Sequence, residues 1–161
     1  MQRIVLLLAT ALAFATLAPA QRDYTGPRPP KPDVPYLMHA DTLVETEASE
    51  AREESRKSES VYSIAGATST ARTPLAEPIF LFLSDKISPD SLGIFRLEVK
   101  GGSRQVVLSK KKRDAHTLRL SATRLADKLY RIEVNEGMGL AAGEYSLSPE
   151  GSNQVFCFAV Y

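Results

Sequence analysis

The side chains that could carry out catalysis are few in this chain. His39 and His116 are its two histidines and lie far apart in the sequence. Neither belongs to a Gly-x-Ser-x-Gly, a His-Glu-x-x-His or a glycine-rich phosphate motif, each of which sets a reactive group beside its partners. Because His116 closely follows Asp114 in a turn-like stretch, we expect it to be a turn residue and not a catalytic base. The sequence therefore predicts no catalytic residues and a protein that is not an enzyme.

Metal and cofactor chemistry have equally little support. Cys157 is the only cysteine, and no group of Cys and His occurs at metal-binding spacing, so we expect no metal and no cofactor. The adjacent acids Glu53 and Glu54 lie in a charged run, which is typical of a solvated surface and not of two catalytic carboxylates. Cys157 lies between Phe156 and Phe158, and we expect it to be a small buried hydrophobic residue. The alternative is an outward-facing thiol that forms an intermolecular disulfide.

One dense basic cluster, at residues 110–113, is a candidate site for an anionic ligand. Four positive side chains on a hairpin tip could contact anionic lipid, nucleic acid or acidic polysaccharide. The alternative is a solvated tip that discourages edge-to-edge pairing of sheets. The net charge of the chain is only +1, which argues against a dedicated polyanion binder, and we expect no nucleic-acid partner. Sugar stacking has little support, because the chain lacks Trp and most of its other aromatic residues occupy alternating core positions.

The connection at residues 67–78 is the second candidate contact region. It is rich in Thr, Ser, Ala and Pro, and its only charges are those of Arg72 and Glu77. A loop this long in a compact domain is usually either functional or disordered. With the basic cluster, it supplies the predicted contact residues for a ligand or partner, which are Arg72, Glu77, Lys110, Lys111, Lys112 and Arg113.

The N-terminus has the pattern of an export signal at residues 1–20. Arg3 is followed by an apolar run over residues 4–17 and by the small residues Ala18 and Ala20, which frame a cleavage site. A membrane anchor is the alternative for this run. No later stretch reaches about 18 apolar residues, so we expect no membrane span after signal removal and a soluble protein, periplasmic or secreted.

The rest of the chain is predicted to be one domain preceded by an arm. Residues 21–35 contain five prolines, which fix φ and remove backbone donors, and this predicts an extended, proline-rich arm. A solvated spacer is favoured over a PxxP ligand. Residues 36–161 then form a single domain, less regular at 36–78 and with its core at 79–161.

The charged stretch at residues 45–60 can be interpreted in two ways. Glu53 and Lys57 have the i, i+4 spacing that suits a solvated helix. The same residues also alternate well enough for two exposed strands that meet near Arg56. A polar hairpin or mobile excursion is favoured, because no apolar stripe exists to dock a helix. A short strand at residues 61–64 then ends at Gly66.

Seven runs with strand character follow from Ile79 onward. Alternation of apolar and polar residues, with a Gly101 and Gly102 turn between two of the runs, predicts an antiparallel β-sandwich. Phe95, Leu97 and Val99 are predicted to form the buried face of their strand. The last run is apolar on both faces, so it is expected inside a sheet or under a cover. The runs are 79–84, 93–100, 104–109, 117–123, 129–135, 144–148 and 154–161.

Residues 140–145 resemble the tyrosine corner of immunoglobulin-like sandwiches, in which a tyrosine entering the penultimate strand bonds back to the preceding backbone. Here Gly143 would permit the close approach, Leu140 would pack beneath, and the Tyr145 hydroxyl would bond to backbone at residues 138–141. Phe156 and Phe158 are the structural residues of the closing strand. The chain has no Trp and no cysteine pair, so it resembles disulfide-free immunoglobulin-like or fibronectin-type modules of exported proteins. This resemblance implies about seven to nine strands and a binding or assembly role.

The combined prediction is an exported, non-enzymatic β-sandwich that acts by contacts with an unknown protein or envelope polymer. One alternative is a carbohydrate- or polyanion-binding module that uses the 110–113 tip or the 67–78 loop. The other is a hydrolase whose site is assembled from residues distant in sequence.

Overall fold

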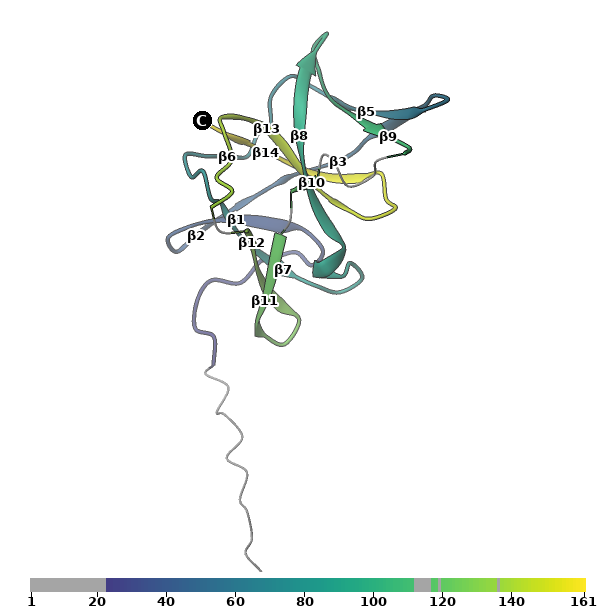
Figure 1. Cartoon of the computed structure of the whole chain (residues 1–161). Coiled ribbons are helices and arrows are strands. Elements are labelled where there is room, and N and C mark those ends of the chain that lie inside the picture. The colour runs from purple at the N-terminus through teal and green to yellow at the C-terminus, as the bar shows by residue number, and fades with distance from the viewer. Residues whose placement is uncertain (1–22, 112–116, 119, 136) are drawn as a thin grey trace, which may run out of the picture.

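The computed structural model describes residues 23–111, 117–118, 120–135 and 137–161 (Figure 1). The fold is all-β and its sheets are antiparallel except for one short pair, which confirms the predicted class. In the described residues, the one helical element is the short 3₁₀ turn η1 (Pro89–Ser91), and no helix there has the length and apolar character needed to span a membrane.

The first sheet has five strands in the order β11-β12-β7-β1-β2. All of its neighbouring strands are antiparallel, and β7 lies at its centre between β12 and β1. Apolar residues at every position of β7 suit a central strand that is covered. The strands are β1 (Pro35–His39), β2 (Thr42–Glu45), β7 (Ile79–Leu83), β11 (Leu120–Ala126) and β12 (Leu129–Val134).

The second sheet has nine strands. Seven lie in the order β3-β14-β13-β8-β9-β5-β4, while β10 pairs with β8 and β6 runs parallel to β14. Its strands are β3 (Glu47–Glu50), β4 (Arg52–Ser55), β5 (Glu59–Ala65), β6 (Arg72–Thr73), β8 (Leu92–Lys100), β9 (Ser103–Ser109), β10 (Thr117–Leu118), β13 (Gly143–Pro149) and β14 (Gln154–Val160). The seven predicted runs from Ile79 therefore all contain strand, and six of them differ from a single observed strand only by a residue or so at the ends. The run predicted at 117–123 needs correction, because it is divided between β10 in the second sheet and β11 in the first.

The main core lies between the two sheets. Phe80 from the first sheet meets the Phe158 ring edge-on, with ring centroids 5.1 Å apart, and Tyr145 stacks on Phe158 at 5.6 Å. Leu140 and Phe156 are buried in the same cluster. The Tyr145 hydroxyl donates to the Ala141 carbonyl at 2.8 Å, which confirms the predicted hydrogen bond at the turn.

The second sheet curls into a half-barrel. β8 and β9 pair only at residues 98–100 and 103–105, after which β8 pairs with β10 and β9 continues along β5. β3 and β4 lie at opposite ends of the strand order but are joined through the single residue Ala51. Because one residue cannot span an open sheet, the two ends must approach each other. Figure 1 shows β5 and β9 projecting away from the first sheet.

A second apolar cluster fills part of this half-barrel. It contains Ala51, Ile64, Leu97, Val155 and Cys157, all buried. This cluster covers the outer face of β14, while the main core covers its inner face. The last strand therefore lies under a cover on both sides, as its apolar residues on both faces predict. Cys157 has 0% exposure, so it is the predicted buried hydrophobic residue, and the alternative of an outward-facing thiol is wrong.

The predicted buried face of β8 needs correction. Leu97 is buried in the second cluster, but Val99 is 55% exposed and Phe95 is half-buried. Ile94, assigned by the pattern to the solvent face, lies in the main core. Both faces of β8 are covered over part of its length, so the alternation of side chains does not distinguish the core face.

The polar stretch at residues 45–60 forms the predicted hairpin and not a helix. β4 pairs with β5 from Arg52 to Ser55, and the Arg56 amide donates to the Glu59 carbonyl across the turn. At the other boundary, the last part of the predicted arm contacts the domain. Asp33 accepts hydrogen bonds from three successive amides at residues 85–87, and Pro35 already belongs to β1.

Candidate functional site

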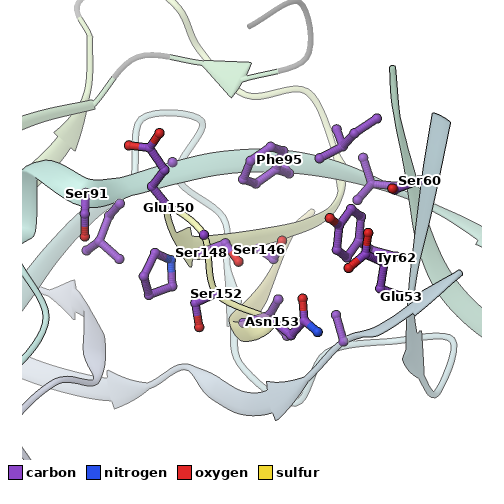
Figure 2. Close-up of a pocket in the computed structure, with 18 of the residues that line it drawn as sticks. Glu53, Ser60, Tyr62, Ser91, Phe95, Ser146, Ser148, Glu150, Ser152 and Asn153 are labelled. Carbon is purple, nitrogen blue, oxygen red and sulfur yellow. The ribbon is translucent and has the colours of Figure 1, made fainter. Parts of the chain in front are cut away.

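A cleft of about 730 Å³ opens on the concave side of the half-barrel (Figure 2). Its volume lies within the range of about 300–1,000 Å³ that is usual for small-molecule sites. The Phe95 ring extends into it from β8, and Ser146 lines it from β13. Tyr62 and Leu108 line it from β5 and β9. In Figure 2, Ser91 and Glu150 lie toward one end, and Tyr62 and Glu53 toward the other.

The alternation of side chains along the strands builds the cleft. On β13, Tyr145 and Leu147 point into the main core, so Ser146 and Ser148 face the cleft. These serine side chains are small and leave space above the strand. Farther along the half-barrel, the larger apolar side chains of Leu97 and Cys157 fill the interior that the serines leave open. The hollow therefore follows from side-chain size on strands that are otherwise regular.

The opposite end of the half-barrel is closed by a buried charge network around Arg104, which is 1% exposed. Its guanidinium binds Glu47, the Ser69 hydroxyl at 2.6 Å, and the carbonyls of residues 65 and 66 at 2.8 and 3.0 Å. Glu144 accepts two hydrogen bonds from Ser69, at 3.0 Å from the amide and 2.5 Å from the hydroxyl. Because buried charges require partners, the network explains why Arg104 can lie inside a sheet.

Burial alone would raise the pKa of Glu47, but hydrogen bonds from Arg104 and the Thr70 amide, together with the positive charge of Arg104, lower it further than burial raises it. The net result is a pKa of Glu47 below its ordinary value. Burial raises the pKa of the Cys157 thiol to about 12, against a smaller opposing effect of Arg104. Cys157 is therefore an inert thiol in the folded protein.

The charged side chains that line the cleft are mostly acidic. They are Glu53, Asp90 and Glu150, all exposed, against Lys110 as the one cation among the described lining residues. The Lys110 ammonium already donates to the Ser55 hydroxyl at 2.8 Å and to the carbonyl of residue 56 at 2.5 Å. The cleft thus has a negative rim and no uncommitted positive group among those residues.

Two serine side chains line the cleft without a hydrogen-bond partner among the described residues. Ser146 is 2% exposed and Ser60 is 6% exposed, and both line the cleft. Within the described residues, neither hydroxyl makes a hydrogen bond to protein, unlike that of Ser148, which donates to the Gln154 carbonyl at 2.8 Å. Neither oxygen is among the fully buried polar atoms that lack a partner, so both hydroxyls are open to the cleft and available to a bound molecule.

The structure does not unite the predicted contact residues. Lys110 lines the cleft and Lys111 follows it at the end of β9, whereas Lys112 and Arg113 lie outside the described residues. Arg72 packs over the Tyr161 ring at 4.6 Å. Glu77 borders a separate hollow of about 500 Å³ beside Arg131 and Glu133.

The loop at residues 67–78 is held by the domain. The amide and hydroxyl of Ser69 bind Glu144, and the Thr70 amide donates to Glu47 at 2.9 Å. The Ala159 amide donates to the Ala71 carbonyl at 2.9 Å. These contacts use the loop to close the half-barrel, a structural role that its composition does not reveal.

The described histidine does not line the cleft. His39 lies 3.0 Å from the Thr73 hydroxyl and is not among the lining residues, and His116 lies outside the described residues. The described part of the chain contains no group of three or more His, Cys, Asp or Glu side chains that could hold a metal ion.

Comparisons with protein-family models, curated proteins and solved structures find no match to this chain. The cleft is therefore the main guide to function.

Proposed function

We propose that this chain is an exported, non-enzymatic binding module with an immunoglobulin-like sandwich, and that its ligand occupies the cleft. The ligand is part of another protein or of an envelope polymer. The observation that carries the proposal is the cleft itself, about 730 Å³ in volume and lined by Phe95, Tyr62 and small hydroxyl side chains. Concave sites that combine aromatic surface with a few polar groups are typical of ligand binding.

The strand order supports the immunoglobulin-like interpretation. In immunoglobulin sandwiches one sheet contains strands D, E, B and A, and the other contains G, F, C and C′. The orders β11-β12-β7-β1 and β14-β13-β8-β9 correspond to these two series. Tyr145 then lies on strand F, the strand that carries the tyrosine corner, and makes the expected type of bond to residue 141.

The segment between β1 and β6 is what distinguishes this chain from a plain sandwich. It supplies β3, β4 and β5, which extend the second sheet and lie over the outer face of β13 and β14. In an ordinary sandwich this outer face is solvated. A shorter segment would be enough to connect β1 to β6. That this segment is long and encloses a hollow over the outer face supports a binding role.

The alternatives have less support. A polyanion would meet the carboxylates of Glu53, Asp90 and Glu150, while Lys110 is already hydrogen-bonded within the protein. A hydrolase would need a nucleophile beside a base, and His39 contacts Thr73 away from the cleft. Non-enzymatic binding is therefore the function that the described geometry favours.

Export rests on the sequence pattern, because residues 1–20 lie outside the described residues. Arg3, the apolar run that follows it and the small residues before Gln21 support cleavage by a signal peptidase. The proline-rich residues that follow would then link the domain to its new N-terminus.

Filling the cleft is the direct test. Leu108 lines the cleft, whereas its neighbour Val107 points to the other face of β9 and is 44% exposed. We expect the mature chain and the V107W variant to retain the same component of the native envelope fraction, and the L108W variant to lose it. Both variants should unfold cooperatively, which thermal melts followed by circular dichroism would establish. Equal retention by L108W would contradict a ligand in the cleft.

A further inference from the structure

We infer that the ligand of the cleft is a neutral saccharide that stacks on Phe95 and hydrogen-bonds to Ser60 and Ser146. This inference rests on the proposed function and specifies its ligand. The polar residues that line the interior of the cleft and are themselves mostly buried, Ser60 and Ser146, carry uncharged hydroxyls. A hydroxyl donates one hydrogen bond and accepts others. Its natural complement is a ligand whose own groups both donate and accept, as sugar hydroxyls do.

Phe95 supplies the apolar surface that a sugar ring requires. Its side chain is half-buried and lines the cleft where β8 and β9 have separated. Within the described residues it takes part in no ring–ring contact of the kind that Phe80, Tyr145 and Phe158 make. The C–H groups on one face of a pyranose can therefore pack on the Phe95 ring while the hydroxyls at its edge reach the serines. This combination of an aromatic platform with hydroxyl partners accounts for both features of the cleft.

The charges favour a neutral ligand over a charged one. Glu53, Asp90 and Glu150 are exposed at the rim, where salt screens them. They repel anions and can accept hydrogen bonds from sugar hydroxyls. A cationic ligand would be attracted to the rim, but the buried serines Ser60 and Ser146 carry no charge that would replace the water it loses on entering.

An extended peptide fits the cleft less well. A peptide that added a strand would need a free backbone edge. At Phe95 the edge of β8 is already paired with Thr117, and at Ile94 with Leu118. Beside Phe95, the side chains are therefore left to recognise the ligand, as in most small-molecule sites.

The test uses the full mature chain and a panel of soluble probes in calorimetric titrations. The neutral probes are β-1,4-linked glucose, β-1,4-linked N-acetylglucosamine and α-1,4-linked glucose oligomers, and the charged probes are heparin and oligolysine. Each is titrated at about 10 mM and about 1 M salt, between which the Debye length falls from about 30 Å to about 3 Å. We expect at least one neutral oligomer to bind with an affinity that changes less than about twofold across this range, because its contacts are uncharged.

Three variants locate the binding. Phe95→Leu keeps an apolar side chain but removes the ring, and Ser146→Ala removes one hydroxyl that has no protein partner. Each should weaken binding of the neutral oligomer about tenfold or more, which corresponds to about 1.4 kcal/mol. Val99→Ala, on the same strand but exposed, is the matched control and should bind normally. Ser146→Ala should also melt no lower than the parent, which separates lost binding from lost folding.

Any of four results would overturn the inference. If only oligolysine binds, and salt abolishes that binding, the ligand is cationic. If no neutral oligomer binds while L108W still loses the envelope component that V107W retains, the cleft binds a ligand of another class and the proposed function stands. If L108W retains that component as well, the proposed function fails together with the saccharide assignment. Retention of heparin that disappears when Lys110, Lys111 and Lys112 become Ser would instead favour the basic tip.

Discussion

Replacing Arg104 with Met should cost the fold more stability than any other single charge removal among the described ion pairs. The guanidinium is 1% exposed and binds Glu47, Ser69 and two backbone carbonyls, and it lies 3.9 Å from Glu144. Met has similar length and leaves no large cavity, so the loss is mainly electrostatic. Removing one partner of a buried ion pair costs about 3–5 kcal/mol, because the other charge stays buried without compensation.

This range should hold here because the remaining acids have little access to water. The side chains of Glu47 and Glu144 are 22% and 10% exposed. For a domain of this size, about 1 kcal/mol moves the melting temperature by about 3–4 °C. Arg104→Met should therefore melt about 10–20 °C lower, as measured by circular dichroism and checked by urea unfolding at neutral pH. The double variant Arg104→Met with Glu47→Gln should recover part of this loss, because it removes an uncompensated charge.

Arg124 gives the matched control. Its guanidinium is 3.0 Å from Asp127, but the two side chains are 57% and 87% exposed. Exposed pairs contribute about 0–1 kcal/mol, so Arg124→Met should melt almost as the parent does. A loss below about 1 kcal/mol for Arg104→Met, equal to that of the control, would show that the network does not support the half-barrel.

Three further predictions concern single side chains. Tyr145→Phe should lose about 1 kcal/mol with its bond to the Ala141 carbonyl, whereas Tyr130→Phe should not; equal melts would count against the corner. The pKa of Glu47 is lowered in the folded state, so the stability that its carboxylate contributes is fully present above its ordinary pKa of about 4.5 and is lost as the pH falls through the lowered value. In a urea series below pH 5, Glu47→Gln should therefore lose less stability on acidification than the parent does. Cys157, with 0% exposure and a pKa raised to about 12, should react with a thiol reagent only at the rate of unfolding, and rapid labelling of the native protein would contradict its burial.

The strands after Ile79 could be predicted because local pattern determines them. Alternation of apolar residues and the Gly101 and Gly102 turn depend on neighbours in sequence, and both glycines adopt the positive φ that such a turn requires. The tyrosine-corner bond could be predicted for the same reason, because its donor and acceptor are four residues apart. Local chemistry was enough for the strand content and for one tertiary hydrogen bond.

The cleft could not be predicted, because it depends on contacts between segments far apart in the chain. The polar stretch at residues 45–60 was correctly expected to be a hairpin, but nothing in it shows that Ala51 joins the two ends of one sheet. Without that closure, Phe95 appears to belong to a core and Ser146 to a solvent face. The basic cluster drew attention because of its charge, yet the Lys110 ammonium is hydrogen-bonded within the protein.

The inward-facing side chains of β9 and of β13 both change in charge and size along the half-barrel. On β9 they pass from Arg104 to Val106 to Leu108, and on β13 from Glu144 to Ser146 to Ser148. At one end, opposite charges meet through Ser69 and leave no room. At the other, apolar and hydroxyl side chains face each other across open space. Since the backbone is regular strand throughout, the closed end gives a rigid base for the cleft. Side-chain size at alternate positions therefore determines where a ligand can enter.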